Sequence, residues 1–102
     1  MAYEVEWAES AIDDLIEQLD FVARDSPSYA SSLSLKAEKA AASLDHFPYR
    51  GRAVPEYEDQ TIREIQVSSY RLIYQVTAKR VWIIGFVHVA RDLTRLLERA
   101  EE

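Results

Sequence analysis

Hydrophobic and polar positions follow two different periods near the start of the chain. Tyr3, Val5 and Trp7 alternate with two glutamates, and this period of two is typical of a strand with one buried face. From about residue 9 the apolar positions recur every three or four residues, which predicts a helix. The apolar face of that helix comprises Ile12, Leu15, Ile16, Leu19, Val22 and Ala23.

A second helix is predicted directly after the first. Ser26 is a good N-cap residue, and Pro27 after it suits the first helical position. Pro48 then ends the helical pattern. The apolar stripe between these points comprises Ala30, Leu33, Ala37, Ala40, Ala41, Leu44 and Phe47. We expect the two helices to form an antiparallel hairpin.

The second half of the chain has the pattern of a small antiparallel sheet. A long loop covers residues 48–60, and three β-rich runs follow at Thr61–Val67, Tyr70–Val76 and Val81–His88. The separators between these runs are short enough for hairpins. Leucines at helical spacing then predict a short terminal helix over residues 91–100. The expected fold class is α+β, with an N-terminal strand and a two-helix hairpin packed on the sheet, in one domain of residues 1–102.

The last strand is apolar on both faces. It is therefore predicted to be a central strand that is covered on both sides, or covered on one side by the helices and on the other by a partner. If the helices cover one face, the outward set is either Trp82, Ile84 and Phe86 or Val81, Ile83 and Val87. The terminal helix hides part of this second face. The remaining apolar area predicts a partner chain, and an ordinary homodimer is the simplest alternative.

Length and composition limit the class of protein. A chain of 102 residues suits one core, and the absence of cysteine excludes a disulfide scaffold, a thiolate zinc site and a cysteine nucleophile. No apolar run is long enough to span a bilayer, and the N-terminus lacks the pattern of a signal peptide. We therefore expect a cytoplasmic domain with no membrane partner.

The net charge of −6 is distributed unevenly. Residues 1–50 hold ten acidic and four basic side chains, whereas residues 51–102 hold eight of each. Between Gln60 and Arg91 there are five basic side chains and one acidic one. The second half is therefore where a polyanion would bind, and an unevenly charged solvated surface is the alternative.

Few residues are available for chemistry. The two histidines lack any metal-ligand spacing, and two glycines 34 residues apart do not make a phosphate-binding loop. We expect no metal and no cofactor. Glu56 in the loop, Arg71 and Arg63 on strands and His88 at a strand end remain. A carboxylate, an arginine and a histidine are sufficient for RNA cleavage without a metal, with salt-bridged or structural roles as the alternative.

An ordered series of short blocks is similar to one known family. The blocks are Asp25–Pro27, Phe47–Arg52, Val54–Glu56, Ile62–Ile65, Tyr70–Tyr74 and Val87–Asp92. Together they resemble the RelE/ParE superfamily of toxins, the plasmid-stabilisation proteins of type II toxin–antitoxin systems. The resemblance covers the chain from Tyr3 to about Leu93. It implies a small antiparallel sheet packed against two N-terminal helices, and an antitoxin that wraps and neutralises the toxin.

The superfamily has two activities, and the resemblance implies one or the other. The first is ribosome-dependent cleavage of messenger RNA, or action on a related target. In that case Glu56 is the general base, Arg71 the phosphate clamp and His88 the general acid. The alternative is inhibition of DNA gyrase without nuclease activity. Under either activity, the residues expected to bind substrate or antitoxin are Arg63, Arg91 and Arg52. The alternative role of Arg63, Arg71 and Arg91 is ion pairing, with antitoxin carboxylates or with Glu64 and Asp92 of this chain.

Partners and assembly follow from the same resemblance. The expected partners are a cognate antitoxin and either the ribosome with its message or DNA gyrase. A homodimer or a heterotetramer with the antitoxin is possible. Two other classes stay open: a catalytically silent module that acts in a repressor complex with its antitoxin, and a homodimeric structural protein.

Overall fold

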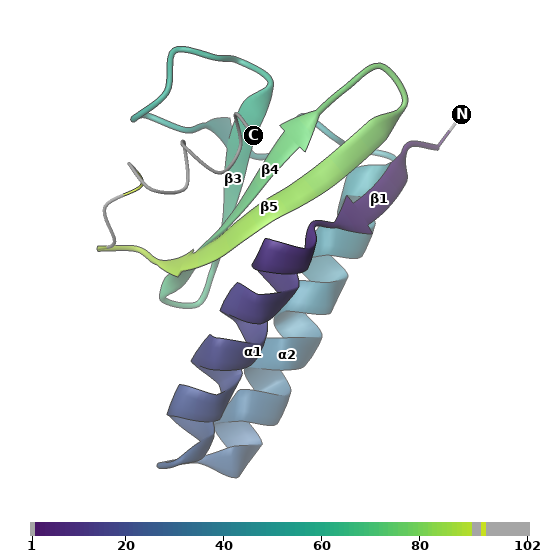
Figure 1. The fold of residues 1–102 in the computed structure, drawn as a ribbon. Coiled ribbons are helices and arrows are strands. Elements are labelled where there is room, and N and C mark those ends of the chain that lie inside the picture. Colours follow the sequence, from purple (N-terminus) through teal and green to yellow (C-terminus); the bar gives the residue numbers. More distant parts are fainter. Residues whose placement is uncertain (1, 91–92, 94–102) are drawn as a thin grey trace.

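The computed structural model describes residues 2–90 and residue 93. Two helices pack against one face of a five-stranded sheet, which confirms the α+β prediction (Figure 1). The elements are β1 (Glu4–Trp7), α1 (Glu9–Ala23), α2 (Pro27–Ala42), a 3₁₀ turn (Ser43–Asp45), β2 (Arg52–Ala53), β3 (Ile62–Val67), β4 (Tyr70–Val76) and β5 (Arg80–His88).

The strand order in the sheet is β1-β5-β4-β3-β2. Strands β2 to β5 are antiparallel, as predicted, but β1 joins the edge of β5 in parallel, with Val5 opposite Val81. The predicted antiparallel sheet corresponds to β2–β5, and the direction of β1 was not part of that prediction. Most of the chain separates β1 from β5, so no hairpin turn dictates their relative direction.

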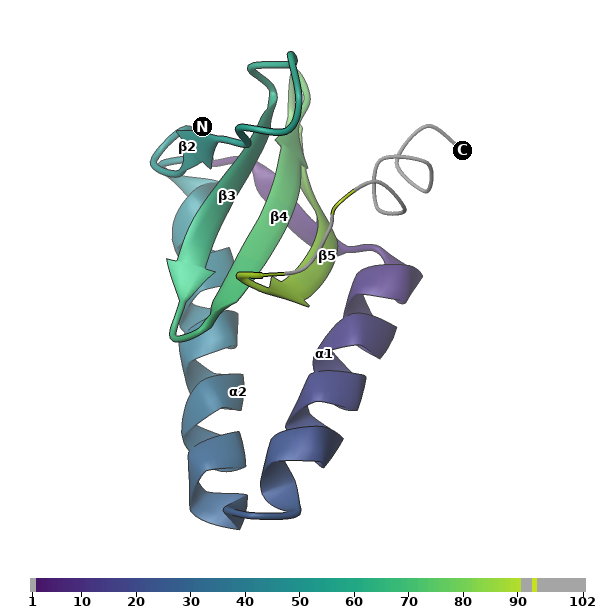
Figure 2. The same cartoon turned by 90° about the vertical axis from the view of Figure 1, so that its left-hand side faces the viewer.

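The helical hairpin follows the sequence prediction at its turn. The helices run antiparallel beside each other (Figure 2). The Ser26 hydroxyl accepts a hydrogen bond from the Tyr29 amide at 3.2 Å, and Pro27 is the first helical residue. Ser26 is thus the N-cap that the sequence indicates.

The predicted apolar faces are wider than the buried ones. In α1, Ala11 is fully buried, whereas Ile12 and Ile16 are 42% and 51% exposed. Helix α2 ends at Ala42, and Phe47, predicted to continue its stripe, is 68% exposed. At the end of α2 the Ser43 hydroxyl donates to the Ala40 carbonyl at 2.6 Å, and such local bonding competes with a continuing helix.

A β-bulge in β5 rearranges the faces of the central strand. The register with β4 shifts between Ile73 and Tyr74. As a result Ile83 and Phe86, three residues apart, both belong to the core beneath the helices. Ile84 and Val87 belong to a second core on the opposite face. Neither predicted outward set is correct, because the bulge breaks the alternation on which both depend.

The second face of the sheet is covered by the chain itself. Val54 and Tyr57 of the long loop pack there with Leu93, over Ile62 and Ile73. Much of the apolar area that was expected to need a partner chain on this face is therefore covered by the loop and Leu93. The large apolar side chains that are exposed lie mostly on and after the helical hairpin: Ile12, Ile16, Phe21, Tyr29, Leu35, Phe47, Tyr49 and Val89.

The described residues leave the predicted terminal helix untested, and they were searched for helices that could span a membrane. The terminal helix predicted over residues 91–100 lies outside the described residues, apart from the buried Leu93. Over residues 2–90, no helix is both long enough and apolar enough to cross a membrane.

Candidate functional site

Four charged side chains meet beside the second core. Arg71 on β4 is paired with Gln66 of β3, and Glu64 lies two residues further along β3. Arg52 on β2 is paired with Glu64. Glu56 comes from the loop that folds over this face. Two strands, a short edge strand and a loop therefore build one cluster, which we call the Arg71 cluster: Arg52, Glu56, Glu64 and Arg71.

The guanidinium of Arg71 binds two carboxylates at once. Its Nε donates to both oxygens of Glu64, at 3.2 and 3.0 Å, and Nη2 also donates to Glu64. Its Nη1 and Nη2 donate to the two oxygens of Glu56, each at 2.8 Å. Both outward edges of the guanidinium are therefore used in bidentate pairs, the strongest arrangement open to arginine.

The two carboxylates that bind Arg71 differ in their exposure to solvent. The side chains of Arg71 and Glu64 are 7% and 3% exposed, whereas that of Glu56 is 42% exposed. Arg52 adds a contact to Glu64 at 3.2 Å from an exposed position. Glu64 is thus the fixed, buried centre of the cluster, and Glu56 is its solvent-facing member.

Hydrogen bonding shifts the pKa values of Glu56 and Arg71 in opposite directions. The bonds from Arg71 hold the pKa of Glu56 below its ordinary value of 4.5. The bonds that Arg71 donates raise its pKa, with the bonds to Glu56 contributing most and those to Glu64 next. A lowered pKa does not suit Glu56 as a general base near neutral pH, since a weaker base takes a proton less readily.

A hollow of about 330 Å³ opens next to the cluster. It is lined by Arg52, Pro55, Glu56, Glu64, Gln66, Arg71 and Val89. Among the two carboxylates bound to Arg71, Glu56 is the one that solvent reaches in this hollow. An anionic group small enough to replace the Glu56 carboxylate would fit there.

Arg63 holds the loop in place on the other face of the sheet. It is paired with Tyr74, which lies in the core beneath the helices. Its Nε donates to the Gly51 carbonyl at 2.9 Å and its Nη1 to the Gln60 carbonyl at 3.0 Å. The guanidinium also lies 5.2 Å from the centre of the Tyr49 ring. Arg63 therefore fastens both ends of the loop, and it is not brought to Arg71.

His88 also lies away from the Arg71 cluster. It is paired with Tyr70, whose ring belongs to the core beneath the helices and contacts the His88 ring edge-on at 5.7 Å. Its Nδ1 accepts a hydrogen bond from the Ala90 amide at 3.2 Å. Of the three predicted catalytic residues, the structure brings Glu56 and Arg71 together and leaves His88 apart. Arg91, predicted to bind substrate or antitoxin, lies outside the described residues.

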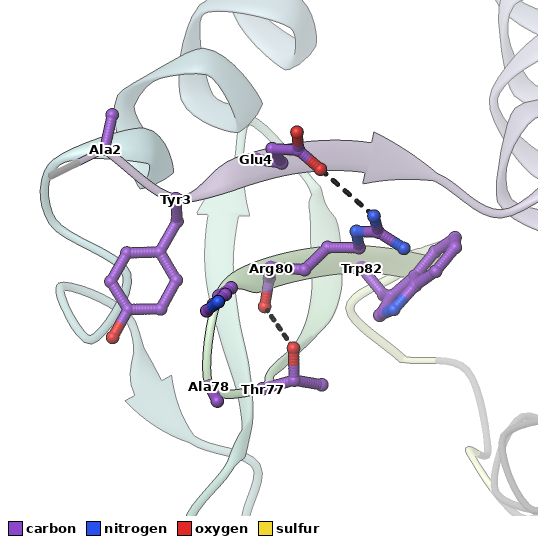
Figure 3. Close-up of a pocket in the computed structure, with 8 residues that line it drawn as sticks. Ala2, Tyr3, Glu4, Thr77, Ala78, Arg80 and Trp82 are labelled. Atoms are coloured by element: carbon purple, nitrogen blue, oxygen red, sulfur yellow. Dashed lines mark hydrogen bonds and ion pairs between the residues drawn. The ribbon is translucent and has the colours of Figure 1, made fainter.

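A larger hollow of about 700 Å³ lies where the β4–β5 turn meets β1 (Figure 3). Arg80 reaches across it to Glu4 at 3.0 Å and to Glu6 at 3.6 Å, and its guanidinium lies 5.2 Å from the centre of the Trp82 ring. Arg80 is thus neutralised by β1. Arg52, Arg71 and Arg80 each bind a carboxylate, and Arg63 binds two backbone carbonyls, so these four strand arginines are engaged within the chain. A polyanion surface on this half of the chain stays a prediction.

Glu64 completes the Arg71 cluster, and the sequence indicated it only as one possible salt-bridge partner of the strand arginines, not as a member of the site. A signal was available, because a two-residue turn at Ser68-Ser69 pairs Gln66 with Arg71 and places Glu64 diagonally across from Arg71 on the same face. Across residues 2–90 and 93, no group of three or more histidine or carboxylate side chains is arranged to hold a metal ion.

Comparisons with known proteins agree with the resemblance in the sequence. The family model described as the ParE toxin of the type II toxin–antitoxin system parDE matches residues 5–93. Toxin RelE2 of Caulobacter vibrioides is 34% identical over 89 residues, which cover 86% of this chain and 97% of that protein.

Solved structures share the fold at low sequence identity. The chromosomal ParDE system of P. aeruginosa matches with a TM-score of 0.70 at 19% identity, covering 86% of this chain and 97% of that one. E. coli toxin RelE, as a double arginine-to-alanine mutant in the free state, gives a TM-score of 0.61 at 19% identity, over 99% and 96% of the two chains. The RelBE2 toxin–antitoxin complex of Mycobacterium tuberculosis gives 0.57 at 19% identity, over 86% and 99%.

The family match extends from the N-terminal strand to the end of the second core, so it includes every element that builds the Arg71 cluster. The chain therefore belongs to the RelE/ParE superfamily, as a ParE-family toxin of a type II toxin–antitoxin system.

Proposed function

We propose that this toxin arrests growth by binding a protein target, DNA gyrase, without cutting RNA, and that a cognate antitoxin neutralises it. The observation that carries the proposal is the state of Arg71. A phosphate clamp needs a free edge of the guanidinium, and here both outward edges bind carboxylates. The cluster therefore resembles a structural ion-pair network more than a preorganised centre for phosphoryl chemistry.

Two further observations support the same proposal. His88, the residue expected to protonate the leaving oxygen, lies on the face of the sheet opposite Arg71. The described strand arginines are engaged within the chain, so they do not form the free basic track that RNA binding uses.

Messenger RNA cleavage remains the second candidate, because one observation favours it. Glu56 and Arg71 are in direct contact, and the nuclease hypothesis expects these two residues in one site. For cleavage, Arg71 must first leave Glu56, and another group must serve as the general acid. These two requirements place RNA cleavage second.

The antitoxin part of the proposal is supported by the family. Two of the structures with this fold are toxin–antitoxin systems, ParDE and RelBE2. Eleven per cent of this chain is aromatic, and several aromatic side chains are exposed on and after the helical hairpin, as at a protein-binding surface.

A supercoiling assay tests the proposed target. Purified chain is added to DNA gyrase with relaxed plasmid and ATP, and we expect loss of supercoiling at near-stoichiometric toxin. His88→Ala is the matched variant, since it removes the expected general acid and leaves the Arg71 cluster intact. We expect it to inhibit as strongly as the wild type. Normal supercoiling at a large excess of folded wild-type chain would contradict gyrase as the target.

A further inference from the structure

Glu56 occupies a place that a carboxylate from outside would also fit. Arg71 holds Glu64, which is fixed on β3 and buried, and Glu56, which comes from the loop and is 42% exposed. Arg71 and Glu56 both line the hollow of about 330 Å³, and Nη1 and Nη2 of Arg71 hold the Glu56 carboxylate there. Of the two carboxylates, Glu56 is therefore the one that solvent reaches and that an incoming group can replace.

We propose that this hollow is a docking pocket for one acidic side chain of a protein partner, and that Glu56 fills the pocket in the free chain as an internal substitute. The inference rests on the proposed function, because it takes the partner to be a protein.

The charge of the pocket suits a single carboxylate. Without Glu56, the lining carries two arginines and the Glu64 carboxylate, which leaves one positive charge. The other lining residues, Pro55, Gln66 and Val89, are uncharged. One aspartate or glutamate restores neutrality and recovers the bidentate geometry at Arg71. A nucleic acid strand would find one net charge here and, within residues 2–90 and 93, no continuing track of free strand arginines.

The exchange leaves no buried donor without a partner. Arg71 keeps its bonds to Glu64 throughout, and the outside carboxylate takes over the two bonds that Glu56 releases. The loop is fastened separately, by Arg63 at its two ends and by the bond from the Gly51 amide to the Tyr74 hydroxyl at 3.0 Å. Departure of the Glu56 side chain therefore does not require the loop to unfold.

A tethered carboxylate competes strongly with a free one. Its effective concentration is on the order of millimolar or higher, so the free chain binds a small carboxylate weakly. Removal of Glu56 removes that competition, and the pocket then binds a carboxylate from solution.

The experiment uses Glu56→Ala in the purified full-length chain, with Glu58→Ala as the matched control from the same exposed stretch of the loop. Sodium acetate is titrated at constant ionic strength, and the ¹⁵N–¹H signal of the Arg71 Nε group is followed. We expect Glu56→Ala to bind acetate at least tenfold more tightly than the wild type or the control. Glu56→Gln, which keeps the size and removes the charge, repeats the comparison if the alanine variant does not fold.

The outcomes separate the possible ligands. Equal acetate affinity in Glu56→Ala and Glu58→Ala would overturn the internal-substitute role. A parallel titration with inorganic phosphate tests the other anion, and binding tenfold tighter than acetate would overturn the carboxylate assignment in favour of a phosphate ligand. Neither readout involves gyrase or RNA, so failure of this inference leaves the supercoiling test of the proposed function unaffected.

Discussion

Glu64 determines whether Arg71 can be buried on this sheet. Its carboxylate binds both Arg71 and Arg52 and is the least exposed group in the Arg71 cluster. A buried guanidinium needs a charged partner and satisfied hydrogen bonds, because its desolvation is costly. At the residue scale, the site is therefore a network of ion pairs. Glu56 is its solvent-facing member and is the group that we propose a partner's carboxylate replaces.

Glu64→Gln tests this account of burial. The change leaves the positive charges of Arg71 and Arg52 with only the exposed Glu56, and breaking a buried pair typically costs about 3–5 kcal/mol of unfolding free energy. Urea unfolding measures the loss. Arg52→Ala is the control, since the exposed pair of Arg52 is worth less than about 1 kcal/mol. Equal midpoints for Glu64→Gln and wild type would show that the network does not support Arg71.

The pH dependence of stability tests Glu56. Its folded pKa is lowered by Arg71, so the unfolded chain binds a proton first as the pH falls. The contribution of the Glu56 pair is therefore fully present above the ordinary value of 4.5 and is lost as the pH falls through the folded pKa. We expect the stability difference between wild type and Glu56→Gln to shrink below pH 4.5 in urea titrations. A difference that stays constant down to about pH 2 would exclude the ion pair as its source.

Part of the Arg71 cluster was predictable from residue patterns. Alternation in β4 placed Arg71 away from the core beneath the helices, and the same rule placed Arg63 with Ile65 on the other face. The contact between Arg71 and Glu56 did not follow from alternation or periodicity, because these do not determine the path of an irregular loop. Only the family resemblance implied one site for both residues. His88 is separated from Arg71 because it is paired with Tyr70, the residue next to Arg71, and so lies on the opposite face of the sheet. Knowing only that His88 ends a strand does not give this pairing.

At the scale of elements, the loop between the 3₁₀ turn and β3 has two structural roles. It closes the second core with Val54 and Tyr57, and it carries Glu56 to Arg71. Its entry is fixed at Gly51, whose amide donates to the Tyr74 hydroxyl. A Cβ added at Gly51 would lie against the Glu64 carbonyl oxygen and 2.6 Å from the Tyr74 hydroxyl.

Gly51→Ala should therefore displace the start of the loop. Contact with the β3 backbone cannot be relieved by a side-chain rotation, so we expect a loss of at least about 2 kcal/mol in unfolding free energy, in the range of strained small-to-large changes. Tyr74→Phe is the control for the hydroxyl, and loss of that one bond costs about 1–3 kcal/mol, since it leaves the buried Gly51 amide unpaired. A Gly51→Ala variant as stable as wild type would show that the approach at Gly51 is not tight.

The order and type of elements were largely predictable, and their fine geometry was not. Ser26-Pro27 and Ser68-Ser69 mark the helical turn and the β3–β4 hairpin through local chemistry. The parallel pairing of β1 depends on contacts between distant parts of the chain, and the bulge in β5 depends on its register with β4. Neither is encoded in the period of a single segment.

At the scale of the whole molecule, two cores lie on opposite faces of one sheet and leave the Arg71 cluster beside the smaller core. The acidic first half of the chain forms the helical side. The described arginines of the second half, Arg52, Arg63, Arg71 and Arg80, are bound within the sheet and its loop. This distribution favours recognition of a protein over recognition of a long polyanion, which is the central claim of the proposed function.

Mapping of RNA 5′ ends in cells, shortly after induced expression of this chain without its antitoxin, tests that claim most directly. We expect growth arrest with intact messages, in the wild type and in His88→Ala alike. New 5′ ends at in-frame codon positions, lost in Arg71→Ala, would contradict the claim and would identify the toxin as a ribosome-dependent endoribonuclease.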